Sequence, residues 1–249
     1  IRYSHLGDKF QFMAGSASAV NFVIDNNSRI SLSNNDGGGV NNTVFGYNAF
    51  ASADSGATGN TALGDAALYA GNVAGEDNNT AIGFNAGFNC EGAENVYVGK
   101  SAGGGGTGAE SNNVGVGSNA LAAITDGTHN VAVGYYSGVN ITTGDDNVTL
   151  GKSAGNAFNS SNVVAVGSNA LAAITSADAD GTVAIGKSAL AANTEGQYST
   201  AIGFSSLNAN QTGDGCTAVG YNSLLLSTNN DNTAMGRESL ASNVGGASN

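Results

Sequence analysis

The chain has 249 residues, among them 39 Gly and no Pro or Trp, and only 10% of its residues are charged. Its net charge of -12 with seven Lys and Arg disfavours nucleic acid as a ligand, because binding to phosphates requires clustered basic residues. No apolar run approaches the roughly 18 residues of a membrane span, and there is no basic and then apolar leader. Such a composition is typical of disorder, but the aliphatic residues recur at fixed places, so they can be buried.

The first predicted element is a β-hairpin within residues 21–33, where apolar residues alternate on either side of an Asp25-Asn26-Asn27 turn. We assign residues 1–40 to an N-terminal hairpin cap or adaptor that shields the first unit of the following domain. The first residue is Ile and the last residues stop partway into another unit, so we expect a piece of a longer or processed polypeptide.

From residue 41 to residue 249, one phrase repeats: a polar residue, Val or Thr, a residue that is usually small, an aliphatic residue, Gly, two variable positions, and Ala or Ser. Residues 79–86 and 130–137 are examples, and successive glycines of the phrase are 16 to 19 residues apart. These glycines are Gly46, Gly64, Gly83, Gly99, Gly117, Gly134, Gly151, Gly167, Gly186, Gly203, Gly220 and Gly236. So short a period predicts stacked coils, and we expect residues 41–249 to form a parallel β-solenoid of about twelve rungs in an all-β protein.

Within the phrase, the Val or Thr and the aliphatic residue before Gly lie two positions apart, as on one face of a β-strand. We expect this face to form the core of the coil. The small residue between them, as in Ala132, is expected on the opposite face, close to another surface. Ala or Ser three positions after Gly indicates a place without room for a larger group. A second, less regular apolar strand is expected after the glycine bend.

The glycine of the phrase fits a tight corner, because φ is positive there or because a neighbouring backbone comes close. One rung buries too little apolar surface to offset an entropy loss of roughly 1 to 2 kcal/mol per residue, so each rung needs its neighbours. The row of Ala would leave a flat apolar strip along the stack. Self-association, most simply into a homotrimer about the long axis, would cover this strip; a monomer is the alternative.

Residues 130–134, 182–186 and 199–203 resemble the phrase Asn-Ser-Val-Ala-Ile-Gly in the head repeats of trimeric autotransporter adhesins of the YadA type. The resemblance covers residues 41–249 and implies a left-handed parallel β-roll with three chains side by side or intertwined. The units here are longer than is general in that family. The run 21–33, leading into residues 42–46, is similar to segments of bacteriophage long tail fibres, which implies a virion protein.

Catalytic chemistry has few candidates in this sequence. The only imidazoles, His5 and His129, form no convincing Ser/His/Asp set. Carboxylate pairs occur on the β-helices of tailspike enzymes, and the pairs here are Asp145 with Asp146 and Asp178 with Asp180. The alternative is that these are solvated loop acids. The same acids could hold calcium, which prefers hard oxygen ligands, but the spacing of a calcium-binding repeat is absent and diffuse attraction of cations is the default. We predict no catalytic, cofactor-binding or metal-binding residue.

The position after the glycine carries four of the seven basic residues and several aromatic ones. It is occupied by Tyr47, Phe84, Lys100, Tyr135, Lys152, Lys187, Phe204, Tyr221 and Arg237, among others. We expect an outward ladder there. It could stack on sugars of a host polysaccharide, or it could cover the strip between rungs or form salt bridges to a neighbouring chain.

Two further expectations concern Cys and Thr. Cys90 and Cys216 lie eight rungs apart, which at roughly 4.8 Å per rung is about 38 Å, too far for a disulfide. The Thr of the phrase is expected to face inward, which disfavours binding to ice.

The leading functional hypothesis is a non-enzymatic, structural or adhesive fibre segment of a phage tail fibre or comparable surface appendage. It would be a rigid, extracellular, trimeric rod for attachment to a host. Its expected partners are other virion or fibre proteins at its ends and a glycan or protein receptor on the host surface. One alternative is the head of an autotransporter-type adhesin on a bacterial surface, and another is a polysaccharide-degrading tailspike.

Overall fold

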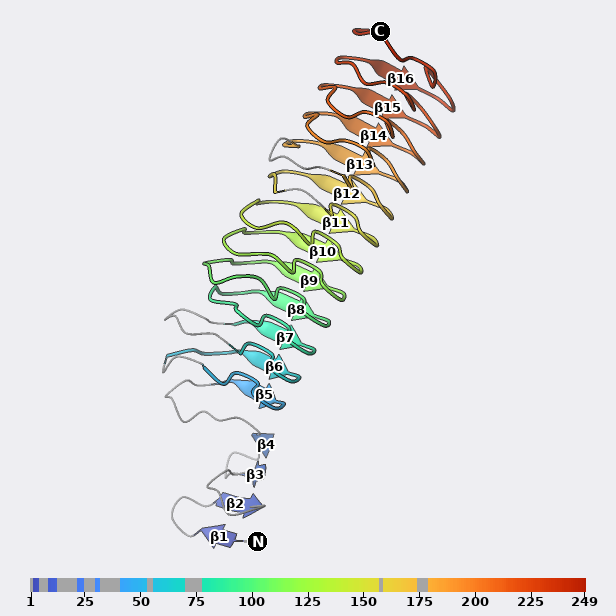
Figure 1. Cartoon of the computed structure of the whole chain (residues 1–249). Helices are drawn as coiled ribbons and strands as arrows, with labels where there is room; N and C mark the ends of the chain where they lie inside the picture. Colours follow the sequence, from blue (N-terminus) through green and yellow to red (C-terminus); the bar gives the residue numbers. More distant parts are fainter. Residues whose placement is uncertain are drawn as a thin grey trace.

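We describe the protein from a computed structural model (Figure 1). The structure describes residues 41–52, 56–69, 78–156, 159–173 and 179–249, and four strands among the first forty residues. These are β1 (Arg2–Ser4), β2 (Lys9–Phe12), β3 (Phe22–Ile24) and β4 (Ile30–Ser31), which form one antiparallel sheet in chain order. The predicted pairing of β3 with β4 is therefore present, its turn lies outside the described residues, and the role as a cap stays a prediction.

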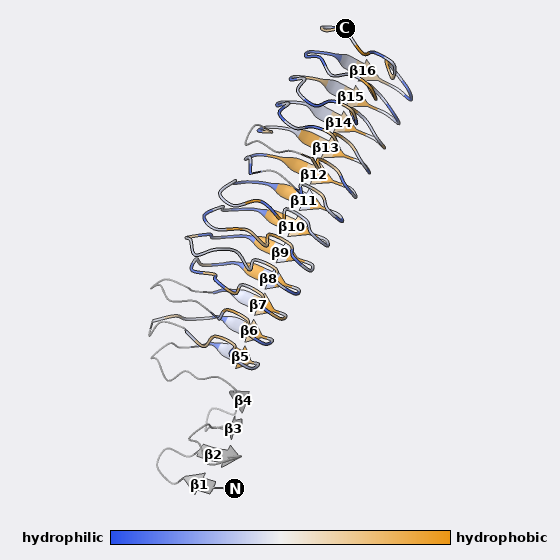
Figure 2. Cartoon of the chain, in the orientation of Figure 1, coloured by the Kyte–Doolittle hydropathy of each residue, from blue (hydrophilic) through white to orange (hydrophobic). Residues whose placement is uncertain are grey.

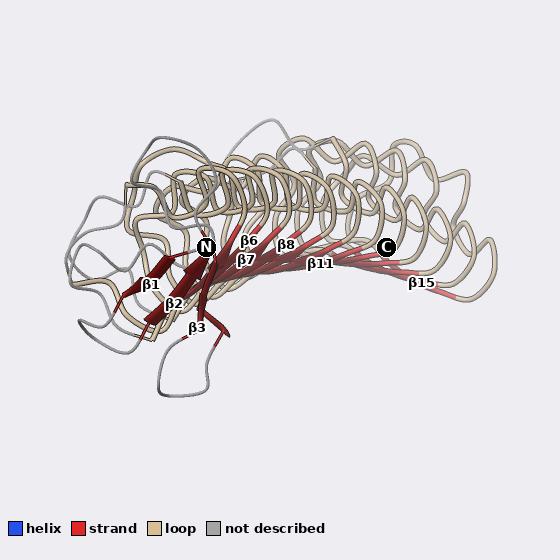
Figure 3. Ribbon diagram, turned by 90° about the horizontal axis from the view of Figure 1, so that it is seen from below, coloured by secondary structure: helices blue, strands red, loops and turns tan. Residues whose placement is uncertain are grey.

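The phrase repeats form one parallel sheet of twelve strands in consecutive order. The strands are β5 (Thr43–Phe45), β6 (Thr61–Leu63), β7 (Thr80–Ile82), β8 (Val96–Val98), β9 (Val114–Val116), β10 (Val131–Val133), β11 (Val148–Leu150), β12 (Val164–Val166), β13 (Val183–Ile185), β14 (Thr200–Ile202), β15 (Thr217–Val219) and β16 (Thr233–Met235). Each strand pairs in register with the next, as Val131 does with Val148. The strands follow one another along one side of the stack, and turns and loops complete each coil (Figure 3). The prediction of a parallel β-solenoid is confirmed, and no described residue is helical.

The predicted orientation of the strands is wrong. The middle residue of each strand is buried, with Ala132 fully so, whereas the residues on either side are partly exposed. Val133, which was expected in the core, is 39% exposed. The inward residue is small in most strands because Leu side chains from the opposite wall of the coil fill the interior and leave little room on the strand. These fully or almost fully buried residues are Leu68, Leu121, Leu171, Leu190, Leu207 and Leu224.

The chain after each glycine forms a turn, and the second apolar strand expected there is absent from the described residues. Two residues of this turn have positive φ in every coil, as Asn119 (57°) and Leu121 (51°) do in the coil of β9. Between them lies the small residue, here Ala120, which is fully buried as predicted. Leu at positive φ is strained, and its burial in the coil offsets that strain.

The glycine corner has both properties that the sequence predicts. At Gly134 φ is +136°, and an added Cβ would lie 2.5 Å from the carbonyl oxygen of Gly151 in the next coil. Only Gly accepts both the conformation and the approach of the neighbouring backbone. Backbone N–H groups satisfy the carbonyls across each corner, as Gly134 N–H does at the oxygen of Val116 (2.8 Å).

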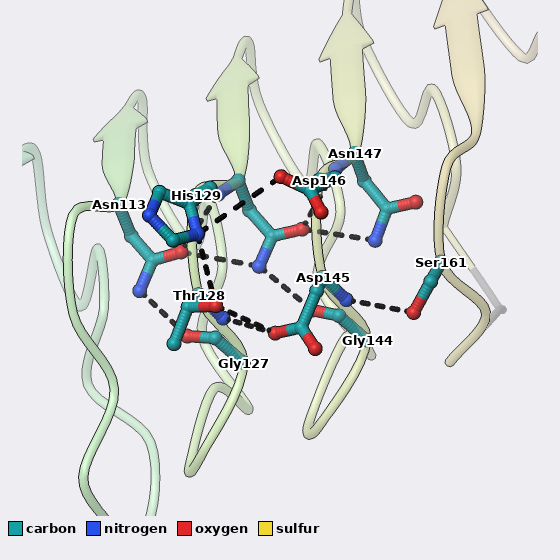
Figure 4. A network of polar contacts seen from close by, with 10 residues as sticks. Asn113, Gly127, Thr128, His129, Gly144, Asp145, Asp146, Asn147 and Ser161 are labelled. Carbon is teal, nitrogen blue, oxygen red and sulfur yellow. Dashed lines mark hydrogen bonds and ion pairs between the residues drawn. The ribbon is translucent and has the colours of Figure 1, made fainter.

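A buried row of Asn runs along the interior, with one Asn directly before each of the strands β5 to β11 (Figure 4). The Oδ1 of Asn113 accepts hydrogen bonds from the backbone N–H (2.9 Å) and the Nδ2 (3.1 Å) of Asn130, and Asn130 accepts from Asn147 in the same way. This asparagine ladder consists of Asn42, Asn60, Asn79, Asn95, Asn113, Asn130 and Asn147. It satisfies buried polar groups without water, and each bond joins two coils.

Candidate interface on the outer face of the solenoid sheet

The outward side of the twelve-stranded sheet carries exposed apolar side chains along its length. We call it the outer face: the first and last residues of strands β5 to β16, with the bounds given above. Leu63 (43%), Val133 (39%), Ile185 (37%) and Ile202 (38%) are exposed along it, and Phe45 (56%) and Met235 (76%) lie at its two ends. A continuous apolar strip of this length is unusual on the surface of a soluble monomer.

The outer face is most apolar in its centre (Figure 2). The six strands β8 to β13 begin with Val and end with Val, Leu or Ile, whereas the three strands at each end of the sheet begin with Thr. Thr has nearly the shape of Val but carries a hydroxyl group that favours water. The Thr side chains face outward, so the sequence-based reason for disfavouring ice binding is wrong.

Two rows of residues border the outer face, one on each side. The entry rim precedes the strands by two residues and has positive φ throughout: Asn41, Gly59, Asn78, Glu94, Asn112, His129, Asp146, Asn162, Gly181, Tyr198, Gly215 and Asp231. The exit rim follows the glycines: Tyr47, Asp65, Phe84, Lys100, Ser118, Tyr135, Lys152, Ser168, Lys187, Phe204, Tyr221 and Arg237. All of these residues are exposed except the half-buried Ser118 and Ser168. The outward ladder predicted after the glycines is therefore present.

Four successive residues of the exit rim stack on one another near the C-terminal end. The rings of Phe204 and Tyr221 lie 5.4 Å apart and 13° from parallel. Lys187 Nζ lies 5.8 Å from the Phe204 centroid, and the Arg237 guanidinium carbon lies 5.6 Å from that of Tyr221. Both faces of each ring are thus occupied by neighbouring coils, which leaves mainly the ring edges for a ligand. This stack favours the structural role of the ladder over stacking on sugars.

Two of the candidate acids, Asp145 and Asp180, accept hydrogen bonds from the backbone of neighbouring coils, and Figure 4 shows Asp145. Asp145 Oδ1 accepts hydrogen bonds from Thr128 N–H (2.6 Å) and Thr128 Oγ1 (2.9 Å), and Asp180 Oδ1 accepts one from Ser161 N–H (2.8 Å). Asp146 is exposed and lies 3.9 Å from His129 Nδ1. No group of three or more His, Cys, Asp or Glu side chains suited to a metal ion occurs in the described residues. His5 and Asp178 lie outside them.

Comparisons with known proteins identify no relative. No family model, curated protein or solved structure matches this chain. Among the described residues, no helix is long and apolar enough to cross a membrane.

One polar cluster lies inside the solenoid, where the sequence analysis predicted none. Glu110 is 1% exposed, and burial raises its pKa to about 8. The ring of Tyr97 is fully buried, and burial, together with Cys90 and Glu110, raises the pKa of its phenol well above its usual range. Neither Glu110 Oε2 nor Tyr97 Oη has a hydrogen-bond partner in the described part of the chain. The cluster is enclosed in the core, so it offers no surface to a substrate.

The two thiols are buried as well. Cys90 and Cys216 are 1% and 0% exposed, and no disulfide joins them. Burial, as the largest cause, raises the pKa of Cys216, so its thiol stays protonated and unreactive at neutral pH.

Sequence reasoning predicted an apolar strip along the stack but assigned it to the row of Ala, which is wrong because these Ala residues are buried. The strip consists instead of the larger apolar residues that were expected inside. A usable signal was present at the middle position of the strands. The one aromatic residue there, Tyr97, is accompanied by Gly87, Gly103 and Gly115, where most other coils have Leu or another Cβ-bearing residue. Space around the middle position is therefore limited, which identifies it as the interior.

Proposed function

We propose that the chain is a non-enzymatic, structural and adhesive rod, a segment of a phage tail fibre or comparable surface appendage, that works as a homotrimer of left-handed β-rolls. The outer faces of the copies pack together along the long axis. The resulting rod is extracellular and joins other virion or fibre proteins at its ends. Its loop side or its tip contacts a glycan or protein receptor on the host surface.

The exposed outer face is the observation that supports this proposal. Twelve strands at roughly 4.8 Å and a width of about 10 Å give an apolar strip of roughly 500 Å², and the two rims about double that area. In a trimer each copy shares this area between two neighbours, so each pair of copies buries on the order of 1,000 Å² in total, which is the lower size of a specific interface. Shared burial of the outer face also adds to the narrow core inside each coil.

A measurement of molecular mass in solution tests this proposal. We expect sedimentation equilibrium to give three copies per particle for the wild-type protein. Val148→Glu, in the central part of the outer face, should dissociate the particle, because a carboxylate is costly to bury in an apolar interface. Thr212→Glu, at an exposed loop position, adds the same charge and should leave the mass unchanged. A monomeric wild-type protein would contradict the proposal.

The adhesin alternative shares the rod and its interface and differs in location. Gold-labelled antibodies against the solenoid should bind to virions if the protein is a fibre segment. Labelling of a bacterial outer surface in the absence of virions would favour the autotransporter-type adhesin instead.

A further inference from the structure

We propose that the copies associate parallel and in register, and that ion pairs from the exit rim of one copy to the entry rim of the next fix this arrangement. The inference rests on the self-association in the proposed function and adds its orientation, register and contact residues.

The charges of the two rims correspond coil by coil. The entry rim has three acidic residues, Glu94, Asp146 and Asp231, and each belongs to a coil whose exit rim is basic. The matching basic residues are Lys100, Lys152 and Arg237. In the coil of β14 the two rims instead carry Tyr198 and Phe204, which suit an aromatic contact.

These matched residues do not meet within one copy. They lie on opposite sides of the outer face, separated by a strand and by six positions, which in extended chain is at most about 20 Å. The ion pairs in the described part of the chain are His129 with Asp146 at 3.9 Å and Arg237 with Glu238 at 3.1 Å, and neither crosses the face. The matched acidic and basic residues therefore form no ion pair with each other within the described part of one copy.

A rotation about the long axis brings the matched residues together. Such a rotation keeps every coil at its height and places the exit rim of one copy beside the entry rim of the next. This holds for two copies as well as for three. Lys100 of one copy then faces Glu94 of its neighbour, and the other two pairs form in the same way.

Other arrangements lose these pairs. A shift by one coil places Lys100 beside Asn78 or Asn112, which are neutral. An antiparallel pairing, with its two-fold axis along the strands, places exit rim against exit rim and reverses the coil order. Lys100, which follows the fourth of the twelve strands, then meets Lys187, which follows the ninth. Charges at the edge of an interface contribute more to specificity than to affinity, so we assign these pairs to orientation and register.

Charge exchange at the Glu94 and Lys100 positions tests the inference, because no other charged residue lies in the adjacent coils of either rim. Lys100→Glu and Glu94→Lys each place like charges together and should weaken association about tenfold at low salt. The double variant Glu94→Lys with Lys100→Glu restores opposite charges and should return to within about threefold of the wild type. Lys187→Glu, opposite Gly181, is the matched control and should weaken association less than Lys100→Glu does.

The outcomes separate this inference from the proposed function. A monomeric wild-type protein would overturn both. A multimeric wild-type protein whose double variant is no better than the single variants would overturn the register and leave the self-association standing. Carbodiimide cross-linking of the wild-type protein, mixed from labelled and unlabelled copies, gives a second readout without any variant. A mixed-isotope link between Glu94 and Lys100 is expected, and links from Lys100 only to other coils would overturn the inference.

Discussion

The size of the side chain at the middle position of each strand is limited by residues of the same and the neighbouring coils. Ala occupies it in most coils, and Tyr97 is accommodated because three surrounding positions are Gly. An added Cβ at Gly103 would overlap the Tyr97 ring, and one at Gly115 would lie 3.1 Å from it. Burial of the ring compensates for the Leu side chain that is missing at Gly87 and Gly103. Residues in neighbouring coils are thus coupled through the interior.

Glu110 makes the stability of the solenoid dependent on pH. Its pKa is about 8 in the folded protein and near 4.5 in an exposed carboxyl group, so the folded state favours the protonated form. The free energy of unfolding should therefore fall as pH rises from about 4.5 to about 8, by up to about 5 kcal/mol, and level off above that range. Urea denaturation at a series of pH values measures this slope.

Glu110→Gln is the control for this effect. The variant keeps the shape of the protonated side chain and cannot ionise, so most of the slope between pH 5 and 8 should vanish. Cys90, Tyr97 and Glu91 are the other titratable groups near this carboxyl group. The buried Tyr97 has a raised pKa, so it titrates above this range. An unchanged slope in the variant would assign the pH dependence to other groups.

Among the elements of the fold, the glycine corner joins each strand to its turn and depends on the next coil. Gly134→Ala combines a φ of +136° with a Cβ that would lie 2.5 Å from the Gly151 oxygen. Gly236→Ala has a similar φ of +120° but no atom within 4 Å of the added Cβ. We expect the second variant to lose about 1 to 3 kcal/mol through strain, and the first to lose clearly more. Equal losses in denaturant titrations would show that the approach of the neighbouring backbone is unimportant.

The strands could be predicted from the sequence, but their orientation could not. Every strand from β5 to β16 begins at the Val or Thr of its phrase and ends at the apolar residue before the glycine, as the period of two indicates. A period of two defines two faces without saying which is inside. The preference for large apolar residues in the core assumes that only one face is buried. If other copies cover the outer face, Val133 and Ala132 are both buried. Only the limited space inside the coil then decides which of the two points inward.

The turns were harder to predict because their conformation depends on tertiary packing. Nothing local favours positive φ at Leu121 or Leu190, since Leu rarely adopts it. The Gly residues at the same place in four coils were a signal that positive φ is required there. At the entry rim the signal was stronger, because Asn, Asp and Gly predominate and all three tolerate this conformation.

In the whole molecule, each coil contacts mainly its two neighbours, so stability is a sum over coils and their contacts. The asparagine ladder follows the same rule, because each of its bonds joins one coil to the next. It ends at Asn147, whose Oδ1 accepts from the N–H of Val163 (2.9 Å). Further along, Ser199 Oγ accepts from Cys216 N–H (3.1 Å) in the equivalent place. Asn is therefore not required at this position in every coil, because the hydroxyl group of Ser199 also supplies an acceptor for the N–H group of the next coil.

The coil that begins with β14 and ends before β15 should be removable as a unit. Thr200 pairs with Thr217 and Ala201 with Ala218, so deletion of residues 200–216 joins Ser199 to Thr217 and keeps the register of every later coil. Lys187 then lies beside Tyr221, which preserves a cation–π contact in place of the one to Phe204. We expect a folded rod that is shorter by about 4.8 Å in small-angle scattering. Deletion of residues 200–208 is the control, because it removes half a coil and places Ala209 where a strand must begin. If both deletions unfold the chain equally, stability does not reside in exchangeable coils.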